Sequence, residues 1–229
     1  MLAAITPLVL IYEVGSAIIL TNPREGTRQR IEAERLLGGF FEAFGVAGLL
    51  IPGLALVTVL LAWQVISRDK WRVNFRFVGM MLAESVAWTL PLLVLAAAHS
   101  RAAAMVTPLM QETGGANLGE MSTAAKMTVS IGAGLYEEML FRLVGLALLH
   151  LVLVDLIGLP QKWGAALAVG ISAIAFALYH QPRMPEEWTK AVFFTISGVY
   201  LGTVYVMRGF GIVVWTHAIY DVMVLVLLE

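Results

Sequence analysis

The sequence contains no cysteine, and charged residues are scarce for a chain of this length. None of the 229 residues is cysteine, so disulfides, thiolate nucleophiles and zinc–thiolate sites are excluded. Charged residues make up 14% of the chain, whereas soluble domains carry about 25%. The formal net charge is −1, and this balance offers no basic surface for nucleic acid. We therefore expect no nucleic-acid partner.

Hydrophobic residues make up 59% of the chain and gather in runs of about 20 residues, the length needed to cross a bilayer. The sequence therefore predicts an all-α, polytopic transmembrane helix bundle embedded in the lipid bilayer. Arginine and lysine are divided too evenly among the predicted loops to set an orientation. The seven predicted spans are Met1–Leu20, Phe44–Ile66, Phe77–Ala98, Met127–Leu153, Trp163–His180, Trp188–Met207 and Gly209–Leu228.

The segment from Arg28 to Phe44, between the first two spans, combines charged residues with apolar residues at helical spacing. Leu36, Phe40 and Phe44 recur every four residues after a run of arginines and glutamates. This pattern predicts an amphipathic helix that lies in the membrane interface. The alternative is a solvated connector. The longest non-apolar segment, His99 to Lys126, is predicted to be a loop.

Three charged residues, Glu137, Glu138 and Arg142, lie near the middle of the fourth span. Each such group costs roughly 2.5–3.5 kcal/mol at the centre of a membrane helix. Glu138 and Arg142 are four residues apart, on one helical face where they can pair. Glu137 is rotated by about 100° from its neighbour, so the two carboxylates have different roles. The alternative is that all three form a buried charge cluster that only fixes helix packing.

The later spans add Phe176 with His180, and His217 with Asp221, each pair four residues apart. Ionisable groups at membrane depth must find each other or water, so we expect one shared polar cavity that holds a water molecule. Glu137 could act there as the general base while His180 orients the water. His217 and Asp221 could stabilise an oxyanion. The alternative is a His217–Asp221 hydrogen bond that only joins helices.

Other residues in the spans give weaker indications. Glu13 and Glu84, near span centres, either pair with each other or line the cavity. Gly198 and Gly202 have the spacing of small residues at which membrane helices approach closely.

Three short segments resemble the motifs of a known family. EEMLFR (137–142) resembles the EExxxR motif of the CPBP intramembrane proteases, also called the ABI or CAAX-protease family. FALYH (176–180) resembles the FxxxH motif, and HAIYD (217–221) resembles the motif of a histidine followed four residues later by Asn or Asp. All three occur in the expected order on separate hydrophobic segments. The resemblance covers roughly Lys126 to Leu228.

The resemblance implies an intramembrane endopeptidase that hydrolyses a membrane-associated protein or peptide without a metal cofactor. An asparagine at position 221 could donate a hydrogen bond to an oxyanion, but an ionised aspartate cannot. Asp221 must therefore be neutral or act by orienting His217. The implied roles are Glu137 as base, His180 as the residue that orients the water, His217 and Asp221 as the oxyanion side, and Glu138, Arg142 and Phe176 as their support.

Several alternatives remain open. Two histidines and a glutamate also form a catalytic zinc set, although the chain has no HExxH motif. A proton- or ion-coupled transporter would use intramembrane Glu and His residues and a helix unwound near the midplane, for which Gly132 and Gly134 are candidates. A non-catalytic immunity or scaffold protein on the same fold is the third alternative.

We expect one membrane-embedded domain over residues 1–229. Residues 1–125 provide the N-terminal spans and the amphipathic segment, and residues 126–228 provide the catalytic core. The expected location is a bacterial inner membrane.

Overall fold

The computed structural model describes residues 2–22, 27–28, 31–46, 48, 51–68, 74–106, 121–180 and 187–227. Within these ranges the regular structure is helical, apart from β1 (Thr21–Asn22), which pairs antiparallel with β2 (Thr27–Arg28). The helices are α1 (Leu2–Ile18), α2 (Glu32–Ala43), α3 (Ile51–Ile66), α4 (Phe75–Val106), α5 (Thr123–Glu138), η2 (Met139–Gly145), α6 (Leu146–His150), η3 (Leu151–Leu156), α7 (Gln161–Tyr179), α8 (Trp188–Arg208), α9 (Phe210–Val222) and η4 (Met223–Leu227).

Five helical segments of the described chain are long and apolar enough to cross a membrane. The predicted class, a polytopic transmembrane helix bundle, is therefore confirmed. The predicted number of seven spans is not. The five segments are Phe75–Arg101, Thr123–Leu156, Gln161–Tyr179, Trp188–Arg208 and Phe210–Leu227.

The first two predicted spans are shorter apolar helices, Ala4–Ile18 and Ile51–Ile66. A helix of 16 residues such as α3 is about 24 Å long, less than the roughly 30 Å of a hydrocarbon core. The second span begins later than predicted, at Ile51. Phe44 caps α2, and Gly45 has a left-handed φ of 78°. Phe44 and Gly45 therefore belong to the end of α2 and not to a span.

The third and fourth predicted spans belong to helical segments that are longer than predicted. α4 continues eight residues beyond Ala98 to Val106, so the start of the predicted loop at His99 was wrong. The Met127–Leu153 run lies inside one uninterrupted helical segment, Thr123–Leu156. This segment passes through α5, the π-helix η2, α6 and the π-helix η3.

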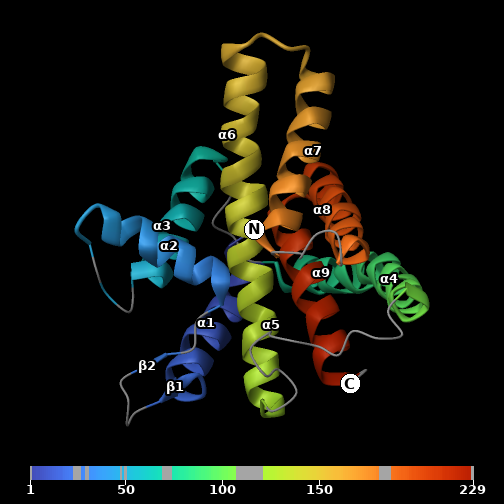
Figure 1. Cartoon of the computed structure of the whole chain (residues 1–229). Helices are drawn as coiled ribbons and strands as arrows, with labels where there is room; N and C mark the ends of the chain where they lie inside the picture. Colours follow the sequence, from blue (N-terminus) through green and yellow to red (C-terminus); the bar gives the residue numbers. More distant parts are fainter. Residues whose placement is uncertain are drawn as a thin grey trace.

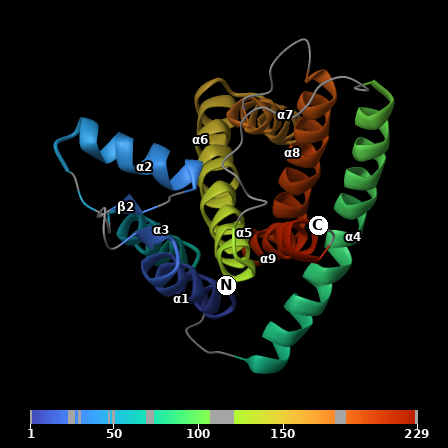
Figure 2. The same cartoon turned by 60° about the horizontal axis from the view of Figure 1, so that its bottom comes forward.

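The long segment from α5 to η3 stands at the centre of the molecule, with α1, α2 and α3 on one side (Figure 1). α7 packs against α6 and α8, and α1 packs against α5. α9 packs against both α5 and α4, and the second view shows it between them (Figure 2). The three helices that carry the predicted motifs, α5, α7 and α9, therefore belong to one bundle.

Glycines set the distance between these helices. A Cβ added at Gly134 of α5 would lie 2.8 Å from the backbone nitrogen of Ala218 on α9. A Cβ at Gly198 of α8 would lie 2.9 Å from the Cα of Ala173 on α7. Small residues at such contacts let membrane helices approach closely, as predicted for Gly198. Gly134 keeps its helical geometry, so α5 is not unwound there.

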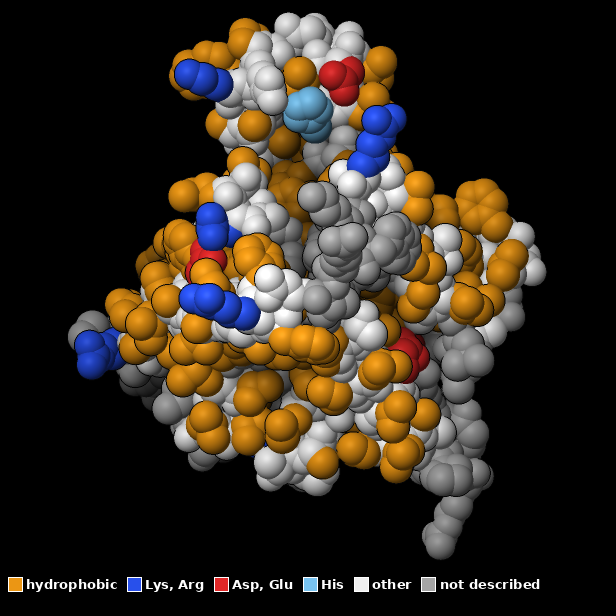
Figure 3. Space-filling view, turned by 180° about the vertical axis from the view of Figure 1, so that it is seen from behind, with side chains coloured by type: hydrophobic (Ala, Val, Ile, Leu, Met, Phe, Trp, Pro, Cys, Tyr) orange, Lys and Arg blue, Asp and Glu red, His pale blue; other side chains and the backbone are white. Residues whose placement is uncertain are grey.

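The outer surface of the bundle is apolar. The face in Figure 3 is largely covered by hydrophobic side chains, with few charged groups among those described. Large apolar side chains with more than half of their surface exposed include Leu90 and Val94 of α4, Leu178 of α7 and Val206 of α8. A surface of this kind is suited to lipid and not to water.

α2 is amphipathic, as predicted from the Arg28–Phe44 segment, but the distribution of its charges differs from the expectation. Leu36 and Phe40 point outward, with 48% and 59% of their surface exposed. On the opposite face Ala33 and Glu34 are buried. Glu34, one of the charged residues of this segment, accepts a hydrogen bond from the Tyr12 hydroxyl of α1.

Candidate active site

Glu137 and Glu138 lie at the point where α5 passes into a π-helix. α5 ends at Glu138, and η2 begins at Met139. Short π-helical segments widen a helix locally and are frequent at functional sites. Both carboxylates are buried, with 7% of Glu137 and none of Glu138 exposed. They face different partners, as their neighbouring positions on the helix predicted.

Glu138 forms the centre of a buried ionic cluster. Its Oε1 lies 3.0 Å from a guanidinium nitrogen of Arg142 and 2.7 Å from Nδ1 of His217. Arg142 is fully buried and also donates to the backbone oxygen of Gly198 at 3.4 Å. The guanidinium group lies 4.4 Å from the centre of the Phe176 ring. This cluster connects α5, η2, α7, α8 and α9.

Glu137 faces the two histidines of the other motifs. Its Oε2 lies 3.9 Å from Nε2 of His180 and 3.9 Å from Nε2 of His217. Both separations are too long for direct hydrogen bonds and are of the kind that a water molecule bridges. All three side chains line a cavity of about 80 Å³. That volume exceeds the roughly 10–15 Å³ needed to hold one water.

The orientation of the His180 ring follows from its second nitrogen. Nδ1 lies 2.8 Å from the backbone oxygen of Phe176. A carbonyl oxygen only accepts, so Nδ1 carries a proton and donates it. In the neutral ring Nε2 is then an acceptor, and it is this atom that faces Glu137. The ring is stacked on Phe194 of α8 at a centroid distance of 3.7 Å.

His217 is oriented in a similar way. Because Nδ1 donates to Glu138, the other ring nitrogen, Nε2, is directed towards the cavity. Nε2 lies 3.5 Å from Oδ2 of Asp221, one turn further along α9. Asp221 lines the same cavity as Glu137. The structure thus brings together all seven residues predicted from the three motifs: Glu137, Glu138, Arg142, Phe176, His180, His217 and Asp221.

Three residues around the cavity had no role in the sequence analysis. The Tyr179 hydroxyl donates to Oε1 of Glu137 at 3.2 Å. Phe194 supports the His180 ring, and Ser197 lines the cavity with a buried hydroxyl that has no hydrogen-bond partner. The only sequence signal for Tyr179 was its place inside the FALYH segment. Phe194 and Ser197 lie on α8, which carries no recognised motif.

Glu13 and Glu84 do not pair with each other and do not line the Glu137 cavity. Glu13 accepts a hydrogen bond from Tyr136 at 3.0 Å, in a cluster on the α1 side of α5. Glu84 accepts two hydrogen bonds from Arg208 and one from the Trp88 ring nitrogen. Both predictions for this pair were therefore wrong, because each carboxylate has nearer donors.

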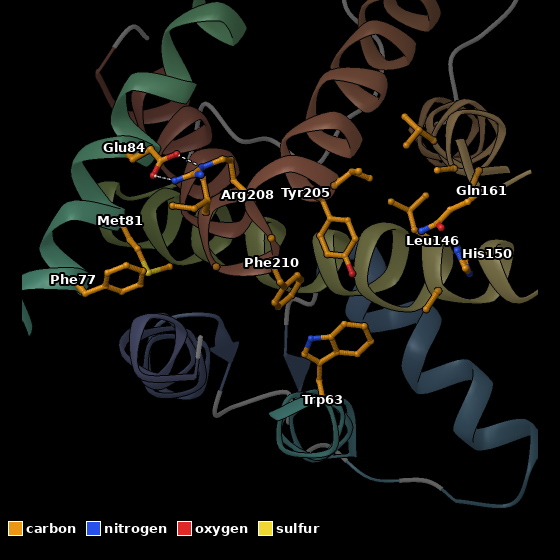
Figure 4. A pocket seen from close by; sticks show the side chains of 18 of the residues that line it. Trp63, Phe77, Met81, Glu84, Leu146, His150, Gln161, Tyr205, Arg208 and Phe210 are labelled. Carbon is orange, nitrogen blue, oxygen red and sulfur yellow. Dashed lines mark hydrogen bonds and ion pairs between the residues drawn. The ribbon is translucent and has the colours of Figure 1, made fainter. Parts of the chain in front are cut away.

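Glu84 belongs instead to a second, larger cavity of about 810 Å³. Figure 4 shows Glu84 and Arg208 facing each other at one end of this cavity, and Gln161 and His150 at the other. Most of its other lining side chains are apolar. It shares no lining residue with the Glu137 cavity.

The described residues contain no group of three or more His, Asp or Glu side chains arranged to hold a metal ion. Glu137, His180 and His217 therefore do not form a ready-made ligand set. The zinc alternative is a matter for experiment.

Comparison with known proteins gives one match. Residues 120–223 match the family described as Type II CAAX prenyl endopeptidase Rce1-like. No curated protein and no solved structure matches the chain. The matched residues include all three motifs and helices α5 to α9. The family predicted from the motifs is thereby confirmed for this segment: residues 120–223, somewhat less than half of the chain, match the Rce1-like CAAX endopeptidases, a family of peptide hydrolases.

Proposed function

We propose that the protein is a glutamate-dependent intramembrane endopeptidase that cleaves a peptide bond of a membrane-associated protein or peptide. The observation that carries this proposal is the position of Glu137, whose Oε2 lies 3.9 Å from Nε2 of both His180 and His217 at one small cavity. The family match to a protease supports the reaction class. The steps of the reaction follow from which of these atoms donate and which accept hydrogen bonds.

A water molecule between Glu137 and His180 would meet two acceptors. It donates one hydrogen to the Glu137 carboxylate and the other to Nε2 of His180, so its lone pairs point away from both. Glu137 accepts a proton as the water oxygen forms a bond to the carbonyl carbon of the substrate. The carbonyl π bond breaks, and its electron pair moves to oxygen to give a tetrahedral oxyanion.

His217 is placed to stabilise that oxyanion. In its charged form it donates from Nε2, which is directed into the cavity, while Nδ1 remains bound to Glu138. Preorganised donors of this kind contribute strongly to catalysis in sites without bulk water. Asp221, 3.5 Å from Nε2, supports the charged form of His217. The role thus assigned to Asp221 is orientation of the histidine and not direct donation.

The tetrahedral intermediate collapses by re-forming the carbonyl π bond and breaking the C–N bond. The leaving nitrogen takes the proton that Glu137 holds, which gives a free amine and returns Glu137 to its carboxylate form. No covalent enzyme intermediate and no resident metal is required. The cavity of about 80 Å³ has room for water but not for a peptide, so the helices around it must separate to admit the substrate.

The decisive test uses purified protein in liposomes with quenched fluorogenic peptides anchored in the same bilayer. One peptide carries a prenylated CAAX end and a second carries an unprenylated membrane anchor. Glu137→Ala is expected to lower the cleavage rate about 10²- to 10⁴-fold, the usual contribution of a general base. His180→Ala is expected to lower the cleavage rate by a similar factor.

Glu42→Gln is the matched control, because Glu42 is an exposed glutamate of α2 and its loss should leave cleavage unchanged. Parental activity in Glu137→Ala would refute the mechanism. Loss of activity with a chelator, restored by zinc, would replace it with the metal alternative. If the parent cleaves neither peptide, the non-catalytic scaffold alternative gains support.

One feature that would favour the transporter alternative is missing from α5. α5 runs through Gly132 and Gly134 without unwinding, so the broken helix that such carriers use is not formed there. The bacterial inner membrane remains our proposed location.

A further inference from the structure

We propose that Tyr179 is a positioning residue for the catalytic base. This inference rests on the proposed role of Glu137. The hydroxyl of Tyr179 donates to Oε1 of Glu137 at 3.2 Å. The other carboxylate oxygen, Oε2, is the one that faces His180 and His217. The two oxygens of the base therefore have separate tasks.

A glutamate needs such an anchor. Rotation about the last side-chain torsion of glutamate meets only a broad, shallow barrier, so an unanchored carboxylate samples many orientations. Within the described part of the chain, Tyr179 alone donates a direct hydrogen bond to Glu137, because both histidine nitrogens lie 3.9 Å away. The hydroxyl thus fixes the plane of the carboxylate and with it the position of the bridging water. Misplacement by about 1 Å at a reacting group costs on the order of 100-fold in rate.

The ring of Tyr179 is itself held by two aromatic neighbours. It meets Phe141 edge-on at a centroid distance of 5.3 Å and His180 at 5.0 Å. These contacts fix the direction in which the hydroxyl group points.

The place of Tyr179 at the end of α7 also connects it to His180. Tyr179 is the last residue of α7, and His180 follows it as the cap, with its backbone N–H donating to Ala177. One short segment therefore sets both the anchor of the base and the histidine that shares its water.

The test is Tyr179→Phe, which removes the hydroxyl and keeps the ring contacts with Phe141 and His180. In the liposome assay kcat is expected to fall about 10- to 100-fold, the range for a lost hydrogen bond to a charged group. KM should change less than twofold, because the hydroxyl does not touch substrate. The ascending limb of the pH–rate profile should move to higher pH, because the lost donor had favoured the ionised carboxylate. His180, His217 and Asp221, which face the same carboxylate, are unchanged in the variant.

Tyr200→Phe is the matched control. Its hydroxyl donates to the backbone oxygen of Trp88 at 2.6 Å, between α8 and α4, outside the catalytic cavity. It should cost stability without changing the pH–rate profile. Thermal unfolding of both variants in detergent measures the structural component of each change.

The outcomes separate this inference from the proposed function. Parental kcat and pH profile in Tyr179→Phe, with Glu137→Ala inactive, would overturn the positioning role and leave the mechanism intact. A loss of kcat that matches a loss of folded protein, with an unchanged pH profile, would also overturn it. Parental activity in Glu137→Ala would remove the proposed function and this inference together.

Discussion

Replacement of Glu138 by glutamine should destabilise the protein far more than its small change in shape suggests. Glu138→Gln keeps an oxygen that can accept from Nδ1 of His217, now 2.7 Å from the carboxylate. It removes the negative charge that lies 3.0 Å from the Arg142 guanidinium. Both side chains of this ion pair are fully buried, so water cannot replace the lost partner.

The expected loss in the free energy of unfolding follows from the burial of the Arg142 charge that remains in the variant. Breaking a buried ion pair by removing one partner costs about 3–5 kcal/mol. Since 1.4 kcal/mol is a tenfold change in an equilibrium constant, this lowers the folded-to-unfolded ratio by roughly 100- to 3,000-fold. The contact between Arg142 and the Phe176 ring, 4.4 Å away, is present in both the parent and the variant, so it does not compensate for the lost carboxylate.

The assay is a double-mutant cycle on Glu138→Gln, Arg142→Met and the double variant. Each protein is unfolded reversibly in mixed micelles, and the free energy of unfolding is compared with that of the parent. The double variant should recover most of the loss, because it buries no unpaired charge. Its coupling energy then reports the ion pair itself.

Equal stability of Glu138→Gln and the parent would refute this reasoning. It would mean that the guanidinium group finds another acceptor or water within the bundle. A double variant as unstable as Glu138→Gln would show instead that the loss came from packing around residue 138.

Two further predictions concern packing around the site. Gly134→Ala should lower the free energy of unfolding by about 1–3 kcal/mol, as overpacking does, because the new Cβ would lie 2.8 Å from the backbone of Ala218. Peptide cleavage should fall by more than this loss of stability explains, because α5 moves away from α9. The control is Gly170→Ala, which meets nothing within 4 Å and should change neither stability nor cleavage. Ser197→Ala should leave the free energy of unfolding within about 0.5 kcal/mol of the parent or raise it, because its buried hydroxyl has no partner; a loss above 1 kcal/mol would reveal a partner for that hydroxyl.

The sequence predicted the polar cluster around Glu137 and Glu138 better than it predicted the spans. Glu138 and Arg142 were expected to pair because residues four apart share a helical face, and they lie 3.0 Å apart. The convergence of His180 and His217 on Glu137 followed from the cost of leaving such groups alone in lipid. These constraints are strong because each polar group must be satisfied inside the bundle.

The remaining features depend on contacts between distant segments. The burial of Glu34 needs Tyr12 of α1, and the partner of Glu84 is Arg208, 124 residues away. The ends of the short spans were missed because an apolar run does not show where a helix stops. Gly45, with its left-handed backbone, ends α2 inside a segment that is apolar on both sides.

The uninterrupted helix from Thr123 to Leu156 has a consequence for the surrounding lipid. Its 34 residues are about 51 Å long, well beyond a typical hydrocarbon thickness of roughly 30 Å. Leu156 and Trp163, at the far end of its hairpin with α7, expose 73% of their surface each, so this end is unsuited to water. The mismatch is relieved by tilting or by local thickening of the bilayer. This helix should therefore either stand oblique to the membrane or thicken the bilayer around the hairpin.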